Sequence, residues 1–191
     1  MALSIVQICN LALARIGITD GIAALSDDTA EARACNLIYE PCRDDLIGSY
    51  DWPFARRTAA LGLVAEDPAE NWAYSYRIPS DCLLARRIDQ GAEYAIAGDS
   101  SGRLLYANLD AVTLTYTARI DDVGLLPHQV AMALAWRLAV ELAPALAKTE
   151  AAADRATVNY QRALATALHT CLNEPHRTTT TDAEAVSARE A

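Results

Sequence analysis

One short stretch of the sequence fits a known catalytic pattern. Residues 98–102, Gly-Asp-Ser-Ser-Gly, match G-x-S-x-G, the motif in which a tight turn presents a nucleophilic serine. That chemistry requires a strand before the turn, a helix after it and a histidine that accepts the serine proton. Strand-like sequence instead lies on both sides of Ser100, in residues 94–97 and 104–106. We therefore interpret the stretch as a hairpin turn, for which Gly, Asp and Ser are favoured residues.

The histidines and the paired acidic residues complete no catalytic or metal site in the sequence. His128, His169 and His176 share no HxH or HxxxH spacing, so their order along the chain gives no zinc-ligand pattern. Carboxylates are favourable at helix starts and on solvated helix faces, where we place the acidic pairs 27–28, 44–45 and 121–122. The sequence also has neither a P-loop nor a GxGxxG motif. We predict no catalytic residues, no cofactor and no metal.

The charge of the chain disfavours a protein that grips nucleic acid. The formal net charge is −9, and the 16 Lys and Arg residues are scattered, with neighbours only at 56–57 and 86–87. Proteins that hold phosphates cluster their basic residues. The five cysteines form no CxxC pair, so we expect buried thiols in a reducing cytoplasm. The most apolar segment, 130–147, contains Arg137, Glu141 and Pro144. We therefore expect a soluble chain without a membrane span or signal peptide.

Helical periodicity dominates both ends of the chain. Ser4 and Gln7 have the spacing of a capping box, and Gly17 supplies the left-handed stop of a first helix. Asp28 and Glu31 predict the start of a second helix, in which Pro41 should cause a kink or a break. Its expected buried stripe is Ala34, Ile38, Cys42 and Leu46.

The same periodicity returns after the middle of the chain. Pro127 suits the first turn of a third helix that runs to about residue 147. Thr149 is the expected cap of a fourth helix. Its apolar face consists of Ala153, Ala156, Tyr160, Ala163, Leu164, Ala167, Leu168 and Cys171.

Between these helices the apolar residues recur with a period of two. Residues 72–78 and 112–119 alternate between apolar and polar side chains, which is typical of strands with one buried face. Shorter strand candidates are 82–88, 92–97 and 103–107. The spacing leaves no room for crossover helices, so an antiparallel meander is expected.

These patterns together predict an α+β fold. We expect a mostly helical bundle, with two N-terminal and two C-terminal helices, a small antiparallel β insert and a polar C-terminal tail. A single domain would cover residues 1–172, with helices in 4–50 and 127–172 and the insert at about 54–120. Residues 173–191 have the polar composition of a flexible arm.

An ordered series of short segments carries a family resemblance. The series comprises residues 9–17 (CNLALARIG), 25–32 (LSDDTAEA), Tyr39, Arg43-Asp44, 52–55 (WPFA) and 74–83 (YSYRIPSDCL). It resembles the tail tubular protein A family, the head–tail adaptors of short-tailed bacteriophages. The later Leu114-x-Tyr116 strand and the helix with Leu134, Leu138 and Leu142 fit the same template, so the likeness extends over about residues 1–172.

The resemblance implies a structural virion protein with no enzymatic activity. Such a subunit forms a ring, typically of twelve copies, between the portal protein and the tail nozzle protein. The ring extends the DNA channel, and DNA passes without sequence-specific binding. The protein would be assembled in the host cytoplasm and would reside in the neck of the virion. In related adaptors the C-terminal segment reaches along the portal, so the candidate arm residues are Asn173, Pro175, Thr178, Thr179, Thr180, Thr181 and Val186.

A second hypothesis assigns the β turns to the tail side of the ring. The residues concerned are Gly91, Gly98, Asp99, Gly102 and Arg103. Three alternatives stay open at this point. The chain could be another neck or tail-completion protein, a small serine hydrolase that uses Ser100, or a helical domain without an assembly role.

Overall fold

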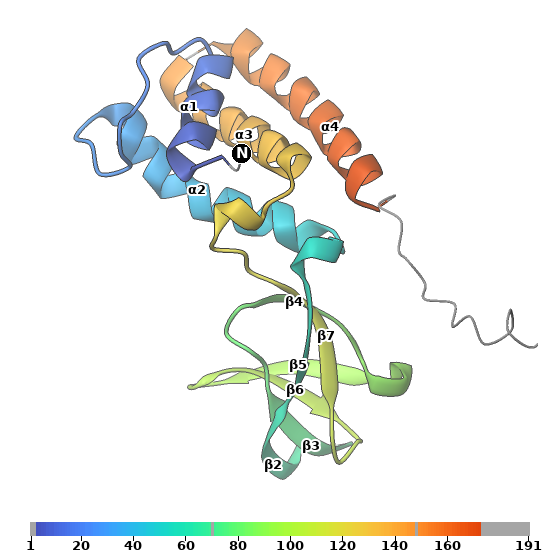
Figure 1. Cartoon of the computed structure of the whole chain (residues 1–191). Helices are drawn as coiled ribbons and strands as arrows, with labels where there is room; N and C mark the ends of the chain where they lie inside the picture. The colour runs from blue at the N-terminus through green and yellow to red at the C-terminus, as the bar shows by residue number, and fades with distance from the viewer. Residues whose placement is uncertain (1–2, 70, 148, 173–191) are drawn as a thin grey trace, which may run out of the picture.

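Helices at both ends of the chain enclose a run of strands. The computed structural model describes residues 3–69, 71–147 and 149–172. Figure 1 shows a helical unit joined through a narrow waist to a β unit. The described elements are α1 (Ile5–Arg15), α2 (Ala30–Ser49), β1 (Arg56–Ala60), β2 (Gly62–Ala69), β3 (Trp72–Arg77), β4 (Cys82–Ile88), β5 (Tyr94–Asp99), β6 (Gly102–Ala107), β7 (Thr113–Ala118), α3 (His128–Leu142) and α4 (Glu150–Leu172).

The strands form far more than the small insert that we expected. They make two antiparallel sheets, ordered β1-β7-β4 and β2-β3-β6-β5, so the prediction of a mostly helical bundle is wrong. The five strand candidates in the sequence correspond to β3–β7, whereas β1 and β2 were missed. No residue of β1 is buried, and neither is any residue from Gly62 to Pro68. Strands that bury neither face carry no alternation of apolar and polar residues.

The first helix has the ends that the sequence predicts. The hydroxyl of Ser4 accepts a hydrogen bond from the backbone N–H of Gln7, and the Gln7 side chain accepts one from the N–H of Ser4. Gly17 follows the helix with a φ of 90°, in the left-handed region that favours glycine. The capping box and the glycine stop are therefore confirmed.

The second helix differs from its prediction at its start and at its proline. The N-cap is Thr29 rather than Asp28, and its hydroxyl accepts from the N–H of Ala32 at 3.1 Å. The helix continues through Pro41 to Ser49 without a break. Pro41 is exposed, so water can reach the backbone carbonyl that loses its helical partner.

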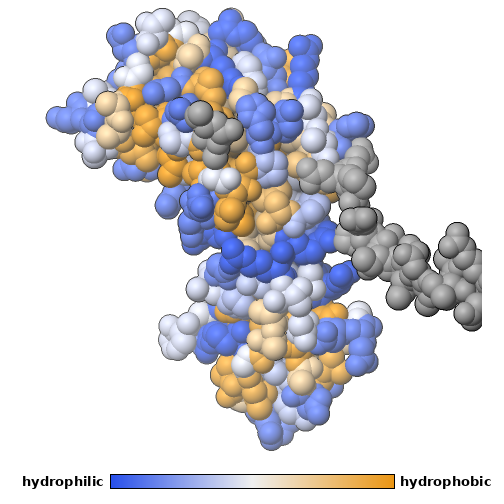
Figure 2. All heavy atoms as spheres, in the orientation of Figure 1, coloured by the Kyte–Doolittle hydropathy of each residue, from blue (hydrophilic) through white to orange (hydrophobic). Residues whose placement is uncertain are grey.

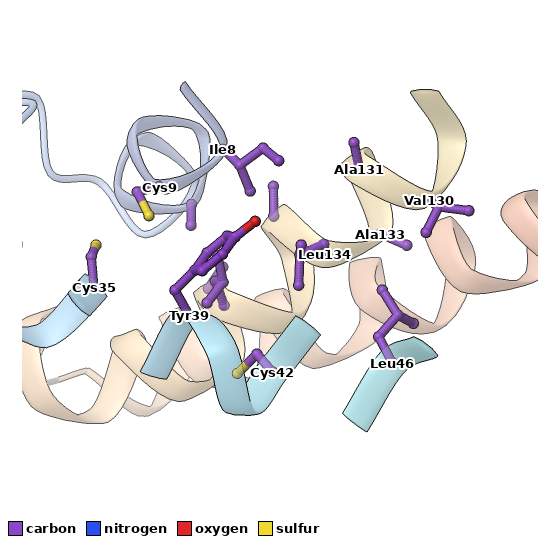
Figure 3. Close-up of a cluster of buried hydrophobic side chains, with 14 of the residues drawn as sticks. Ile8, Cys9, Cys35, Tyr39, Cys42, Leu46, Val130, Ala131, Ala133 and Leu134 are labelled. Atoms are coloured by element: carbon purple, nitrogen blue, oxygen red, sulfur yellow. The ribbon is translucent and has the colours of Figure 1, made fainter. Parts of the chain in front are cut away.

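The third helix forms the centre of the helical unit. It packs against α1, α2 and α4, and the residues that it buries are mostly alanine and leucine. These side chains join Ile8, Cys42 and Leu46 in one core, part of which Figure 3 shows. With the π-helical turn Ala143–Ala147, α3 is long and apolar enough to cross a membrane. Burial between three other helices accounts for this composition.

The β unit has a second core between its two sheets. Tyr76 of β3 and Leu105 of β6 pair in one sheet, while Leu114 of β7 belongs to the other, and all three are buried. Hydrophilic residues gather at the waist between the units in Figure 2. The chain crosses this waist twice, between α2 and β1 and between β7 and α3.

Candidate interaction site

An arginine of the β unit caps the C-terminal end of the second helix. The guanidinium of Arg86 on β4 donates from one nitrogen to the carbonyl oxygens of Gly48 at 3.1 Å and Tyr50 at 2.6 Å. Its Nε donates to the hydroxyl of Thr117 on β7 at 2.8 Å. The last turn of α2 contains no basic residue of its own. Arg86 therefore satisfies carbonyl groups that a helix end leaves without partners, and it ties the helix to the sheet.

Ion pairs around Asp44 reinforce the same waist. Its carboxylate accepts from Nε of Arg43 at 2.9 Å and from Nε of Arg119, just beyond β7, at 2.8 Å. Arg43 is only 4% exposed and also lies 3.2 Å from a carboxylate oxygen of Asp121. A buried guanidinium needs such partners, because removing an unpaired charge from water is costly. These contacts join α2 to the beginning of the segment that leads from β7 to α3.

The predicted hairpin turn at residues 98–102 is confirmed. Strand β5 pairs with β6 as far as Asp99 opposite Gly102. Asp99 binds Arg77 of β3 through both carboxylate oxygens, at 2.8 and 2.7 Å, and also accepts from the N–H of Ser101. The hydrogen bonds from Arg77 and from the backbone lower the pKa of Asp99 to about 2. Gly102 has a φ of 133°, in the region that favours glycine.

A cavity of about 680 Å³ lies beside this turn. Its walls come from the junction of β1 and β2, the loop between β3 and β4, and the hairpin tip. Apolar surface is supplied by Leu61, Ile78 and Pro79, and hydroxyl groups by Ser80 and Ser101. The volume falls within the range that is typical of ligand sites, about 300–1,000 Å³.

Arg103 lies at this cavity and links the two sheets. From β6 it donates through one nitrogen to the carbonyl oxygens of Cys82 at 2.9 Å and Leu83 at 3.4 Å. Among the described residues it has no carboxylate partner. Burial raises the pKa of the Cys82 thiol above its usual value, so the thiol stays neutral and does not balance the charge of Arg103.

The other predicted turn lies at the opposite end of β5. Gly91 precedes β5 and has a φ of 64°, next to Gln90 with a φ of 56°. The nearby groove includes Arg87 and is bordered by Thr58 and Thr115. The five residues assigned to the tail side are thus not brought together: Gly98, Asp99, Gly102 and Arg103 form one group, and Gly91 stands apart.

The residues considered for catalysis do not converge. Ser100 lies at an exposed turn between two strands, so it lacks the strand-to-helix geometry of a nucleophile elbow. His128 begins α3 and His169 lies near the end of α4, both in the helical unit. Among the described residues no group of three or more His, Cys, Asp or Glu side chains could hold a metal ion. His176 and the arm residues 173–191 lie outside the described residues.

Sequence reasoning missed the residues that make the waist and the cavity. Arg86 stood out only as part of an adjacent arginine pair, and Arg77 only as part of the resemblance. Their partners lie 36 residues away at Tyr50 and 22 residues away at Asp99. No local pattern reports a contact over such a separation.

Comparisons with known proteins leave the family of the chain open. No family model matches the sequence, and no curated protein matches it.

Proposed function

We propose that this chain is a head–tail adaptor subunit of a tailed bacteriophage. In this proposal, several copies, twelve by resemblance, form a ring between the portal and the tail, and the protein acts by its shape. The ordered series of segments that resembles tail tubular protein A is the first support. The second is the hydrogen-bonded connection between two structurally different units, which offer separate surfaces to two partners.

The contacts across the waist between the two units are the observation that supports this proposal most. A connector transmits position from one partner to another, so its two ends must not move freely against each other. Arg86 and Asp44 hold the end of α2 to the β unit through hydrogen bonds and ion pairs. Units joined by a narrow connection move relative to each other by default, unless contacts between them oppose the motion. This chain instead carries a set of charged contacts at its narrowest point.

The acidic balance of the chain suits a passage for DNA. With a net charge of −9, the ring would repel phosphates along much of its surface, so DNA could slide through without being held. The C-terminal segment 173–191 is the proposed portal-binding arm. The hairpin tip at Gly98–Gly102 is the proposed contact to the tail nozzle.

Electron microscopy of the full chain mixed with portal rings tests the proposal. We expect an additional ring of density beneath each portal, with a helical layer against the portal and a β layer away from it. Portal rings that remain bare at saturating concentrations of the chain would refute the adaptor role. Copurification with the tail tube rather than with the portal would identify another neck component instead.

A truncation after Leu172 tests the arm separately. Because a segment of such polar composition offers little apolar surface to a core, we expect an unchanged melting curve and a loss of portal binding. Portal binding that survives the truncation would overturn the arm assignment while leaving the ring proposal intact.

A further inference from the structure

The cavity beside the hairpin tip is held in shape by contacts on three sides. The bidentate pair between Arg77 and Asp99 fixes the tip to β3. The N–H of Ile78 donates to the carbonyl of Arg103 at 3.1 Å, which continues the pairing of β3 with β6. Arg103 in turn reaches β4 through the carbonyl of Cys82. A ligand therefore meets a preformed site and pays little of the entropy that ordering a loop would require.

The site carries positive charge in a chain that is negative overall. Of the two arginines at the cavity, Arg77 is neutralised by Asp99, whereas Arg103 donates to the carbonyl oxygens of Cys82 and Leu83 and interacts with the Cys82 thiol, all uncharged groups. Among the described residues no carboxylate pairs with Arg103. A guanidinium that is not already paired binds a carboxylate well, because its planar N–H groups match the two carboxylate oxygens.

The surroundings of Arg103 select for more than charge. The hydroxyls of Ser80 and Ser101 can donate further hydrogen bonds to an anion, and Leu61, Ile78 and Pro79 present apolar surface. An aspartate or glutamate with an apolar neighbouring residue would match both the polar and the apolar groups that line the cavity. The phosphates of a nucleic acid offer no apolar group, and the net charge of −9 repels them.

We propose that this cavity binds an acidic side chain, together with an adjacent apolar side chain, from a partner protein. Given the proposed adaptor function, the partner is the tail component that docks on the hairpin side. The carboxylate pairs with Arg103 and the two serine hydroxyls, and the apolar side chain packs on Leu61 and Pro79.

Titration of the isotope-labelled full chain with 4-methylpentanoate tests the site without any phage component. This probe combines a carboxylate with a branched apolar group. We expect saturable shifts of the backbone amide resonances of Ser80, Ser101 and Arg103. The neutral probe 4-methylpentanamide, which has the same shape, should bind at least fivefold more weakly.

Two substitutions locate the charge that is responsible. We expect Arg103→Gln to weaken binding of the carboxylate at least fivefold and Arg103→Lys to retain part of the affinity. Arg87→Gln, which removes an exposed arginine without a described partner, should leave binding unchanged. Equal binding of the amide, or undiminished binding by a folded Arg103→Gln variant, would overturn the proposal.

The probe experiment and the portal experiment test the binding site and the adaptor function separately. If the chain binds portal rings but not the carboxylate probe, the proposed binding site is wrong and the adaptor function stands. If the chain binds the carboxylate probe but never joins portal rings, the binding site stands and the adaptor function is wrong.

Discussion

Arg86 of β4 donates to the carbonyl oxygen of Tyr50 at the end of α2, across 36 residues of sequence. The same guanidinium nitrogen reaches the carbonyl of Gly48, and Nε reaches Thr117. One side chain of the β unit thereby provides the cap that α2 lacks. Stability of the helix end and orientation of the two units depend on the same contact.

Removing Arg86 should therefore destabilise the whole protein. Arg86→Ala leaves carbonyl groups of a half-buried helix end without donors, and we expect the free energy of unfolding to fall by about 2 kcal/mol. Urea denaturation followed by circular dichroism measures the loss. Its neighbour Arg87 is exposed and makes no described contact, so Arg87→Ala should stay within about 0.5 kcal/mol of the parent. Equal effects of the two substitutions would contradict the capping role.

Removing the hydroxyl group from each of two buried tyrosines should change the stability of the protein in opposite directions. Figure 3 shows Tyr39 extending from α2 toward Ile8, and its hydroxyl has no described hydrogen-bond partner. Burial also raises the pKa of Tyr39 to about 12. We expect Tyr39→Phe to increase the free energy of unfolding by up to about 1 kcal/mol, because an unsatisfied polar group leaves the core.

The matched substitution is Tyr76→Phe in the β unit. The hydroxyl of Tyr76 donates to the carbonyl oxygen of Leu109. Its loss should lower the free energy of unfolding by about 1 kcal/mol. Thermal melts of both variants provide the comparison, and a destabilised Tyr39→Phe variant would show that its hydroxyl is satisfied.

The Arg77–Asp99 pair should make the hairpin tip sensitive to acid. Because the folded-state pKa of Asp99 is depressed to about 2, its contribution to stability is present above the unfolded pKa of about 3.9. The contribution is lost as the pH falls toward and through 2. Carbon-13 titration of the carboxyl groups should give Asp99 a midpoint near 2, and Arg77→Gln should raise that midpoint. An unchanged midpoint in the variant would exclude Arg77 as the cause.

The cysteines should be unreactive until the protein unfolds. All five are buried, and Figure 3 shows the side chains of Cys9 and Cys35 facing each other between α1 and α2. The hydrogen bond with Cys35 and burial raise the pKa of the Cys9 thiol well above its usual value. Because a reagent reaches buried thiols only when the chain opens, a thiol reagent at neutral pH should label five sites in urea and almost none without it. Rapid labelling of the native chain would contradict the burial.

Elements that bury one face could be predicted from the sequence, and those that bury none could not. The apolar face of α1 and the capping residue Ser4 predicted this helix with its correct ends. Strand β7 alternates buried Leu114 and Tyr116 with more polar residues, so its period was visible. Strands β1 and β2 are held by backbone hydrogen bonds to β7 and β3. Those bonds are independent of side-chain type, so the size of the β unit was underestimated.

The candidate site was predictable only in part. The turn at Gly98–Gly102 could be recognised because Gly, Asp and Ser suit a reversal of the chain. The cavity beside it could not, because its walls come from three loops that meet only in the folded protein. The separation of Gly91 from the hairpin tip follows from the length of β5, which the sequence left uncertain at both ends.

The β unit leaves the helical unit and returns to it on adjacent strands, with Arg56 opposite Thr117. A single uninterrupted stretch of the chain can therefore be exchanged without rerouting the backbone of the helices. Natural selection or an engineer could graft a different sheet onto the same helical base, provided that a substitute for Arg86 is retained. Such an exchange would vary the β surface while the helical core stays the same.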